Sequence, residues 1–189
     1  MAVQTNGLTA NSPLHYLMDA GAIYKNLTYD ALTGDFTGTL LGATSGGNEF
    51  ALTQETRVIE VDGAKGQRKG HVVIDSEVPS LTINLKELTA SNIALAIAGS
   101  EIDTTDTNYD IITSKGKIEL TDYLQNIGFV ARLSGSSKPV VIVIDNAISL
   151  EGLTIATTDK NEAVVPVVFT GHEDETGVAP YKIYFPKMV

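Results

Sequence analysis

The chain has 189 residues, and 13 Lys and Arg against 23 Asp and Glu leave a formal net charge of −10. The absence of cysteine excludes a disulfide framework, a Cys-ligated zinc site and a thiol nucleophile. The acidic balance argues against a protein that binds duplex DNA, because affinity for phosphates comes from clustered Lys and Arg.

The composition favours strands over helices. Thr, Ile and Val together account for 53 of the 189 residues, and β-branched side chains suit a pleated sheet. The longest apolar run, 140–144, is far below the roughly 20 residues of a membrane-spanning helix. Residues 1–7 lack the basic start and apolar stretch of a secretory signal, so we expect a protein made in the cytoplasm.

The N-terminal quarter combines an arm, a short strand and loops. Residues 1–20 are small, polar and aperiodic, and we expect a flexible arm over 1–16. Residues 21–27 have the pattern of a first strand. Residues 28–48 are rich in Thr and Gly, which predicts loops around 33–35 and 45–47.

Two further strands, at 49–53 and 56–61, precede a glycine-rich loop that carries basic side chains, and a return strand is expected at 71–75. The loop, 62–70, matches neither known phosphate-binding fingerprint. Both fingerprints need a helix start after the glycines, and here a strand follows. The spacing therefore favours the tip of a hairpin.

The clearest strand is 80–87, where Leu81, Ile83 and Leu85 alternate with polar residues. The period then changes. Thr89 is a candidate N-cap, and Gly99 stands where a helix C-terminus would need it. We expect one short helix of about 8–10 residues here.

Acidic residues dominate the next segment, 100–110, which has no basic residue. Its centre begins like a calcium-binding loop, but Ile111 stands where that loop needs Gly and Lys117 where it needs Glu. We therefore expect an acidic surface loop. Its carboxylates belong to Glu101, Asp103, Asp106 and Asp110.

The second half of the chain continues as strands. Pro166 would lie at a sheet edge or bulge, because proline cannot donate to a ladder. With eight to ten strands and no linker, the chain is predicted to be one mainly β domain, 1–189. We expect a β-sandwich or barrel with one short flanking α-helix and extended loops. The later strands are expected at 127–133, 140–144, 153–157, 163–170 and 181–185.

No catalytic constellation stands out, so neither an enzyme nor a cofactor site is predicted. The three histidines, His15, His71 and His172, lack metal-ligand spacing. The stretch 42–46 is not the Gly-x-Ser-x-Gly elbow of serine hydrolases.

The order of these features resembles the major tail tube proteins of long-tailed bacteriophages. The likeness is one of pattern over most of the chain, apart from residues 100–125. It is carried by the stretches LMDAGAIY at 17–24, LGATSGGNEF at 41–50, RVIEVDG at 57–63 followed by KG at 69–70, LTINLKELT at 81–89, FTGH at 169–172 and APYKIY at 179–184.

The resemblance implies a structural subunit that assembles with itself. Members of the family form hexameric rings that stack into a hollow tube, through which DNA passes without specific binding. The implied partners are other copies of the chain, the tape-measure protein, the tail terminator and distal tail or baseplate proteins, and the implied location is the virion tail. Related tubes occur in contractile tails, phage-tail-like bacteriocins and type VI secretion, so the resemblance leaves the machine open.

Charge and loops suggest how such a tube would work. Six copies of −10 carry −60, which would repel DNA phosphates from a lumen. Either 33–48 or 62–70 is expected to dock on the adjacent ring, the alternative being solvated loops. The residues expected at contacts between subunits or rings are Gly63, Lys65, Gly66, Arg68, Lys69, Gly46 and Gly47, and those expected on an acidic lumen or surface are Glu101, Asp103, Asp106 and Asp110.

Two other classes of function remain open. A β-sandwich can bind carbohydrate or a cell surface, although the lack of Trp weakens a sugar-stacking platform. An enzyme on the same scaffold is the third class, which the motifs do not support.

Overall fold

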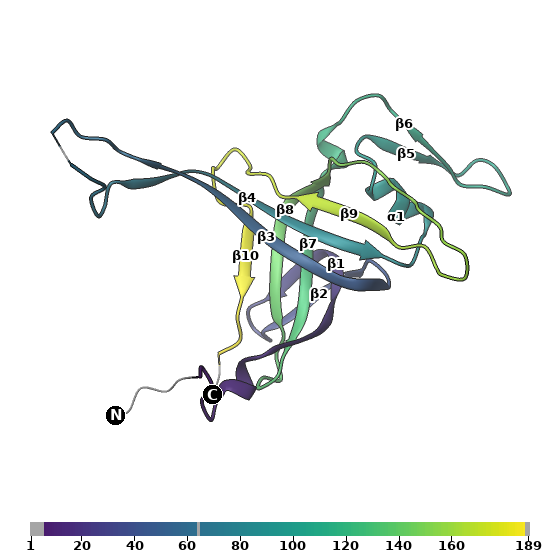
Figure 1. Cartoon of the computed structure of the whole chain (residues 1–189). Coiled ribbons are helices and arrows are strands. Elements are labelled where there is room, and N and C mark those ends of the chain that lie inside the picture. The colour runs from purple at the N-terminus through teal and green to yellow at the C-terminus, as the bar shows by residue number, and fades with distance from the viewer. Residues whose placement is uncertain (1–5, 64, 188–189) are drawn as a thin grey trace.

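The computed structural model describes residues 6–63 and 65–187. Within these residues the chain forms ten strands, one α-helix and two short 3-10 helices (Figure 1). The mainly β class and the expected number of strands are confirmed. The strands are β1 (Leu17–Asp30), β2 (Asp35–Leu40), β3 (Thr44–Val58), β4 (Val72–Leu85), β5 (Ser100–Asp103), β6 (Ile111–Ser114), β7 (Leu124–Leu133), β8 (Val140–Ser149), β9 (Val165–Thr170) and β10 (Tyr181–Tyr184). The helices are η1 (Ser12–His15), α1 (Ala90–Leu95) and η2 (Leu120–Asp122).

Eight strands form one antiparallel sheet in the order β2-β1-β7-β8-β9-β4-β3, with β10 also paired to β8. The sheet folds over at β8, whose first half pairs with β10 and whose last residues, Ile148 and Ser149, pair with β9. Figure 1 shows the two halves crossing, as in a β-sandwich. β5 and β6 form a separate two-stranded sheet.

The main core lies between the two halves of the sheet. Ile23, Ile127 and Ile144 come from one half, and they pack with buried residues of β4 and β9. Along β4 the burial alternates from Pro79 to Leu85, which confirms the period-2 pattern of this segment.

Two buried asparagines satisfy backbone groups where ladders break. Asn126 accepts a hydrogen bond from the Leu27 N–H at 2.6 Å and donates to the Leu27 carbonyl at 2.9 Å. This contact lies at a bulge in β1, beside Asn26 with a φ of 56°. Asn92 of α1 donates to the carbonyls of Leu41 and Glu87 at 2.9 and 3.1 Å.

The helix prediction is confirmed at its start and is too long at its end. The Thr89 hydroxyl accepts a hydrogen bond from the Asn92 N–H at 3.2 Å, as an N-cap does. α1 ends at Leu95, and Gly99 lies four residues further on with a φ of 65°.

Replacing Gly99 with Ala is expected to lower the free energy of unfolding by at least about 1–2 kcal/mol. An added Cβ would lie 2.2 Å from the Lys117 carbonyl oxygen, in a left-handed backbone conformation. The matched change Gly66→Ala meets nothing within 4 Å and has no such φ, so it should have little effect. Chemical denaturation of both variants measures the difference, and equal stabilities would contradict the expectation.

Sequence predictions for three segments of the chain differ from the structure. The loop expected around 33–35 is the turn between β1 and β2, whereas 45–47 lies within β3, which begins at Thr44. Much of the Thr- and Gly-rich segment 28–48 is strand, because β1 extends to Asp30 and β2 follows. β2 is an exposed edge strand, and it therefore lacks the alternation that marks a half-buried one. The segment 153–157 forms no strand, although Leu153 packs against the core. The expected acidic surface loop is confirmed over 104–110, but it is shorter than predicted, because 100–103 and 111–114 pair as the β5–β6 hairpin.

Other expected strands are present with different boundaries. The strands expected at 49–53 and 56–61 are one strand, β3, whose pairing with β4 shifts register at Glu55–Thr56, where Asp75 of β4 is the extra residue. Pro166 lies in β9 opposite Asn84, at a position where β8 does not reach β9, so its edge placement is confirmed. Of the predicted N-terminal arm, residues 1–5 lie outside the described residues. Leu14 and Tyr16 are hydrogen-bonded through their carbonyls to the turn after β7.

Candidate assembly surfaces

A long hairpin projects from the sandwich, and we call its projecting part, residues 53–78, the arm. β3 and β4 stay paired out to Val58 and Val72, about 20 Å beyond the pair of the half-buried Leu52 with the buried Pro79. Figure 1 shows the arm extending away from all other strands. Arg57 and Asp75 form a cross-strand ion pair at 3.2 Å along it.

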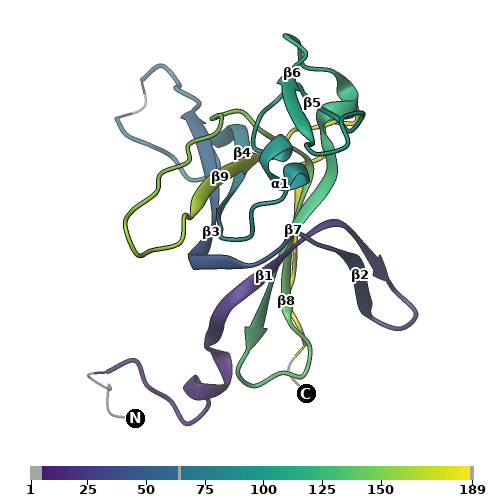
Figure 2. The same ribbon diagram turned by 90° about the vertical axis from the view of Figure 1, so that its right-hand side faces the viewer.

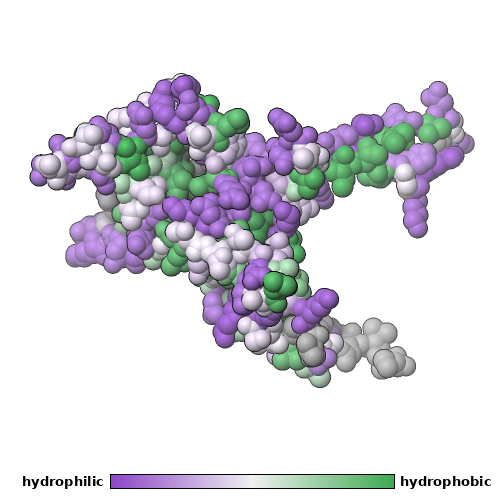
Figure 3. Space-filling model, turned by 180° about the vertical axis from the view of Figure 1, so that it is seen from behind, coloured by the Kyte–Doolittle hydropathy of each residue, from purple (hydrophilic) through white to green (hydrophobic). Residues whose placement is uncertain are grey.

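The arm exposes apolar side chains that its own fold does not cover. Val72 and Ile74 are 54% and 57% exposed, and they share a face because side chains two residues apart in a strand point the same way. Ile59, Val61 and Val78 are exposed as well. Figure 3 shows this as a hydrophobic band along the arm. A contiguous apolar surface of this kind is typical of an interaction site.

Residues 62–63 and 65–70 of the predicted loop form the tip of the arm, as the sequence indicates, and residue 64 lies outside the described residues. Within the described part of the chain, none of its basic side chains lies within 4.0 Å of a carboxylate. The predicted contact residues here are all exposed: Gly63, Lys65, Gly66, Arg68 and Lys69.

Gly46 and Gly47, the predicted contact residues of the alternative segment 33–48, lie apart from the tip of the arm. They lie at the opposite end of β3, in a bulge near the sandwich, with φ of 92° and 88°. The Asn84 amide donates to the Gly47 carbonyl at 2.9 Å. Their role is to shape the start of β3, since L side chains rarely adopt such φ values.

The four predicted acidic residues gather on one hairpin. Residues 100–114, which we call the acidic hairpin, carry four carboxylates and no Lys or Arg. The side chain and backbone N–H of Thr105 hydrogen-bond to Asp103 and lower its pKa. Asp106 accepts from the N–H groups of Asn108 and Tyr109 at 2.8 and 3.0 Å. All four carboxylates are exposed: Glu101, Asp103, Asp106 and Asp110.

An ion pair between two largely buried side chains holds the base of the acidic hairpin. Lys115 bonds to Asp122 of η2, and Glu119 lies 3.6 Å from the same ammonium. The hydrogen bond to Asp122 raises the pKa of Lys115, and the hydrogen bond from Lys115 lowers the pKa of Asp122. The Lys115 N–H also donates to the Gly99 carbonyl at 2.8 Å.

Removing this ion pair with Lys115→Met is expected to speed amide hydrogen exchange in β5 and β6. Because the pKa of Asp122 is lowered, the pair stabilises the hairpin at pH values above the ordinary pKa of an aspartate. Because the pKa of Lys115 is raised, the pair does so at pH values below the ordinary pKa of a lysine. Protection is therefore expected between about pH 4 and about pH 10. It should fade as the pH falls through the folded pKa of Asp122. Lys117→Met, which removes a more exposed lysine, is the control. Unchanged exchange in the Lys115 variant would contradict this role.

The arm and the acidic hairpin lie on different sides of the molecule. In Figure 1 the arm extends to the left and β5–β6 stands at the upper right, and Figure 2 shows them separated as well. The sandwich lies between them, so one chain does not bring the two together.

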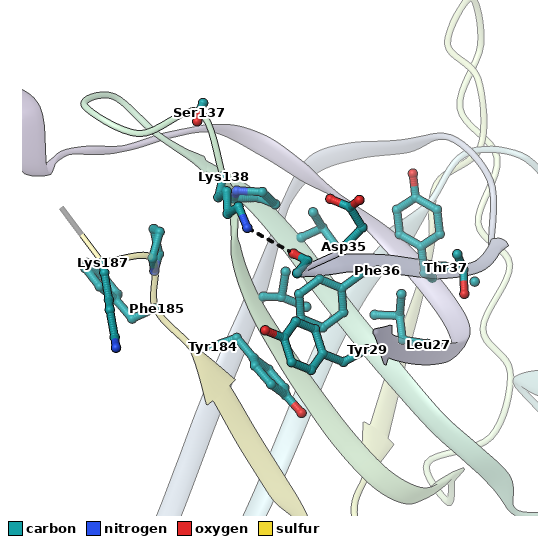
Figure 4. Close-up of a pocket in the computed structure, with 17 residues that line it drawn as sticks. Leu27, Tyr29, Asp35, Phe36, Thr37, Ser137, Lys138, Tyr184, Phe185 and Lys187 are labelled. Carbon is teal, nitrogen blue, oxygen red and sulfur yellow. Dashed lines mark hydrogen bonds between the residues drawn. The ribbon is translucent and has the colours of Figure 1, made fainter. Parts of the chain in front are cut away.

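An aromatic cleft of about 990 Å³ opens on the outer face of β1, β2, β8 and β10 (Figure 4). Tyr29, Phe36 and Tyr184 meet there with ring centroids 4.9 to 5.1 Å apart. Lys138 donates to the Gly34 carbonyl at 3.5 Å on the rim. The sequence did not predict this cleft, because its aromatic residues come from both ends of the chain. Only the turn at 33–35, across which Tyr29 pairs with Phe36, was a signal that two of these rings lie together.

Three strands of the large sheet have one unpaired edge in the described structure. β2 and β3 end the order of the large sheet, and β10 pairs only with β8. Unpaired N–H and C=O groups on such edges can accept a strand from another chain.

The described residues hold no group of three or more metal-ligating side chains. His172 contacts the Thr170 carbonyl at 3.1 Å and packs edge-to-face on Tyr123, as an ordinary structural histidine does. No helix within 6–63 and 65–187 is long and apolar enough to cross a membrane.

Comparison with protein-family models gives no match, and comparison with curated proteins gives no significant match.

Proposed function

We propose that this chain is a structural subunit that assembles into stacked hexameric rings, forming the hollow tail tube of a bacteriophage in the virion tail. The arm is the observation that carries the proposal. It combines uncovered apolar side chains with basic residues that have no partner among the described carboxylates. A monomer gains nothing from such a projection, whereas a stacked assembly would bury it.

Two further features support assembly into a closed tube. The unpaired edges of β2, β3 and β10 would be satisfied by neighbouring copies around a ring. A charge of −60 per ring of six would keep DNA from adhering to the wall. Tape-measure, terminator and distal tail proteins would then be the partners, and a bacteriocin or type VI-like machine would use the same subunit design.

Electron microscopy of concentrated purified protein tests this function. We expect rings or tubes of uniform diameter from the wild-type chain. A protein that stays monomeric at high concentration would contradict the proposal.

Shortening the arm separates its role from that of the β1–β2 turn. Replacing residues 60–70 with Asn-Gly joins Ile59 and His71, which already share a 2.7 Å hydrogen bond, through a two-residue hairpin turn. We expect a folded chain that forms no tubes. The matched edit replaces 31–34 with Asn-Gly. If only that second edit abolished tubes, the stacking role would pass to the 33–48 region.

The aromatic cleft supports carbohydrate binding as a second candidate function. Its rings can present apolar faces to a sugar, although three of them already pack against one another. A glycan array is the test. Binding that is lost on Tyr29→Ala, from a protein that forms no rings, would favour this function over the tube.

A further inference from the structure

We propose that the arm docks on the acidic hairpin of a second copy of this chain, so that copies join head to tail. This inference rests on the proposed function and names the surface that receives the arm. It commits to one occupant of the arm's apolar face, a second copy, for three reasons: charge, apolar surface and placement.

Charge complementarity is the first reason. The tip, 62–70, has three basic residues and Asp62, a net charge of +2, and the acidic hairpin has −4. None of the basic residues of the tip and none of the carboxylates of the acidic hairpin belongs to an ion pair within the described chain. Opposite charges of this size steer association and fix the register of an interface.

Matching apolar surface is the second reason. The acidic hairpin exposes Ile102, Tyr109 and Ile111, of which Tyr109 is 75% exposed. The arm exposes Val72 and Ile74 beside its basic tip. Contact between them would give an apolar centre with a charged rim, which is the usual anatomy of a specific interface.

Placement is the third reason. The two surfaces lie on different sides of the sandwich, so each copy can offer its arm to one neighbour and its acidic hairpin to another (Figures 1 and 2). Such a head-to-tail contact leaves an unused arm at one end of an open assembly and an unused acidic hairpin at the other. Further copies can therefore add until the assembly closes into a ring or extends as a filament. The Lys115–Asp122 pair holds the acidic hairpin in place before contact.

Charge reversal with mixing tests the contact. One variant makes the tip acidic with Lys65→Glu, Arg68→Glu and Lys69→Glu. The other makes the acidic hairpin basic with Glu101→Lys, Thr104→Lys, Asp110→Lys and Thr113→Lys, which shifts its net charge from −4 to +2. Asp103 and Asp106 are kept, because they accept backbone hydrogen bonds that shape the loop.

Each variant alone is expected to lose assembly by about tenfold or more, because like charges would face each other. An equal mixture of the two should assemble again, since each arm then meets an oppositely charged hairpin. Thermal unfolding of each variant checks that the exposed substitutions leave the fold intact. Variants that assemble alone, or folded variants whose mixture fails to assemble, would overturn the contact.

Disulfide trapping identifies the surfaces, because the natural chain has no cysteine. Lys69→Cys mixed with Asp110→Cys should give a covalent dimer under mild oxidation. The control pairs Lys69→Cys with Asp174→Cys, which lies in an exposed turn elsewhere. Equal trapping with the control, or none with Asp110→Cys, would contradict the inference. Wild-type tubes with either result would leave the proposed function standing, whereas a monomeric wild-type chain would count against both.

Discussion

Replacement of Phe169 with Ala is expected to lower the free energy of unfolding by about 3–5 kcal/mol. Phe169 is 1% exposed and lies in β9 between Leu81 of β4 and Ser149 of β8. It therefore packs where the sheet folds over on itself. Removing the ring loses its buried apolar area and leaves a cavity that the surrounding strands fill only in part. Urea denaturation followed by circular dichroism measures the change.

The matched control is Phe185→Ala. Phe185 is 60% exposed, so the same deletion should change stability by no more than about 0.5 kcal/mol. A loss below about 1 kcal/mol for the Phe169 variant would mean that the two halves of the sheet do not pack through this ring.

Replacement of Asn126 with Leu is expected to cost about 2–5 kcal/mol. The side chain keeps nearly the same size, but the N–H and C=O of Leu27 both lose their partner at the β1 bulge. Each buried backbone group left without a hydrogen bond costs about 1–3 kcal/mol, and neither can reach water here, because Leu27 and Asn126 are both buried. Denaturation with urea again gives the free energy.

Two companion variants isolate the hydrogen bonds. Gln125→Leu makes a similar exchange at the exposed neighbouring position and should have little effect. Asn126→Asp keeps the acceptor for the Leu27 N–H but places a buried carboxyl group against the Leu27 carbonyl, so its loss of stability should grow as the pH rises and the carboxyl ionises. Equal losses from Gln125→Leu and Asn126→Leu would show that the hydrogen bonds are unimportant.

Stability and assembly should respond to different residues. The Phe169 and Asn126 variants act on positions that are buried within one chain, whereas the arm and acidic-hairpin variants change exposed residues. A substitution such as Lys69→Glu should therefore leave the unfolding midpoint unchanged while it reduces assembly. This separation allows a failure to assemble to be distinguished from a failure to fold.

Local patterns predicted the elements that local physics controls. The alternation of Leu81, Ile83 and Leu85 identified β4, because a strand with one buried face has period 2. Thr89 identified the start of α1, because its hydroxyl caps an N–H only three residues away. The strands that escaped prediction, β2, β5 and β6, are mostly exposed, so burial imposes no pattern on them.

The candidate site was only partly visible for the same reason. The basic tip and the acidic segment follow from composition alone, and the structure confirms that both are exposed. Gly46 and Gly47 shape a bulge at the start of β3, which the sequence did not indicate, because a glycine-rich stretch looks alike whether it ends a hairpin or shapes a bulge. The aromatic cleft joins Tyr29 with Tyr184, and no local rule relates residues so far apart in the chain.

By itself, the sequence determined the mainly β class, the acidic charge, the absence of thiol chemistry and the location of the charged loops, since these depend on residue type and short-range spacing. The tertiary structure alone decided that β8 joins both halves of the sandwich, that the hairpin of β3 and β4 projects as an arm, and that its tip lies away from the acidic hairpin. Strand pairing between distant segments is a property of the whole chain, because each pairing depends on the packing of all the others.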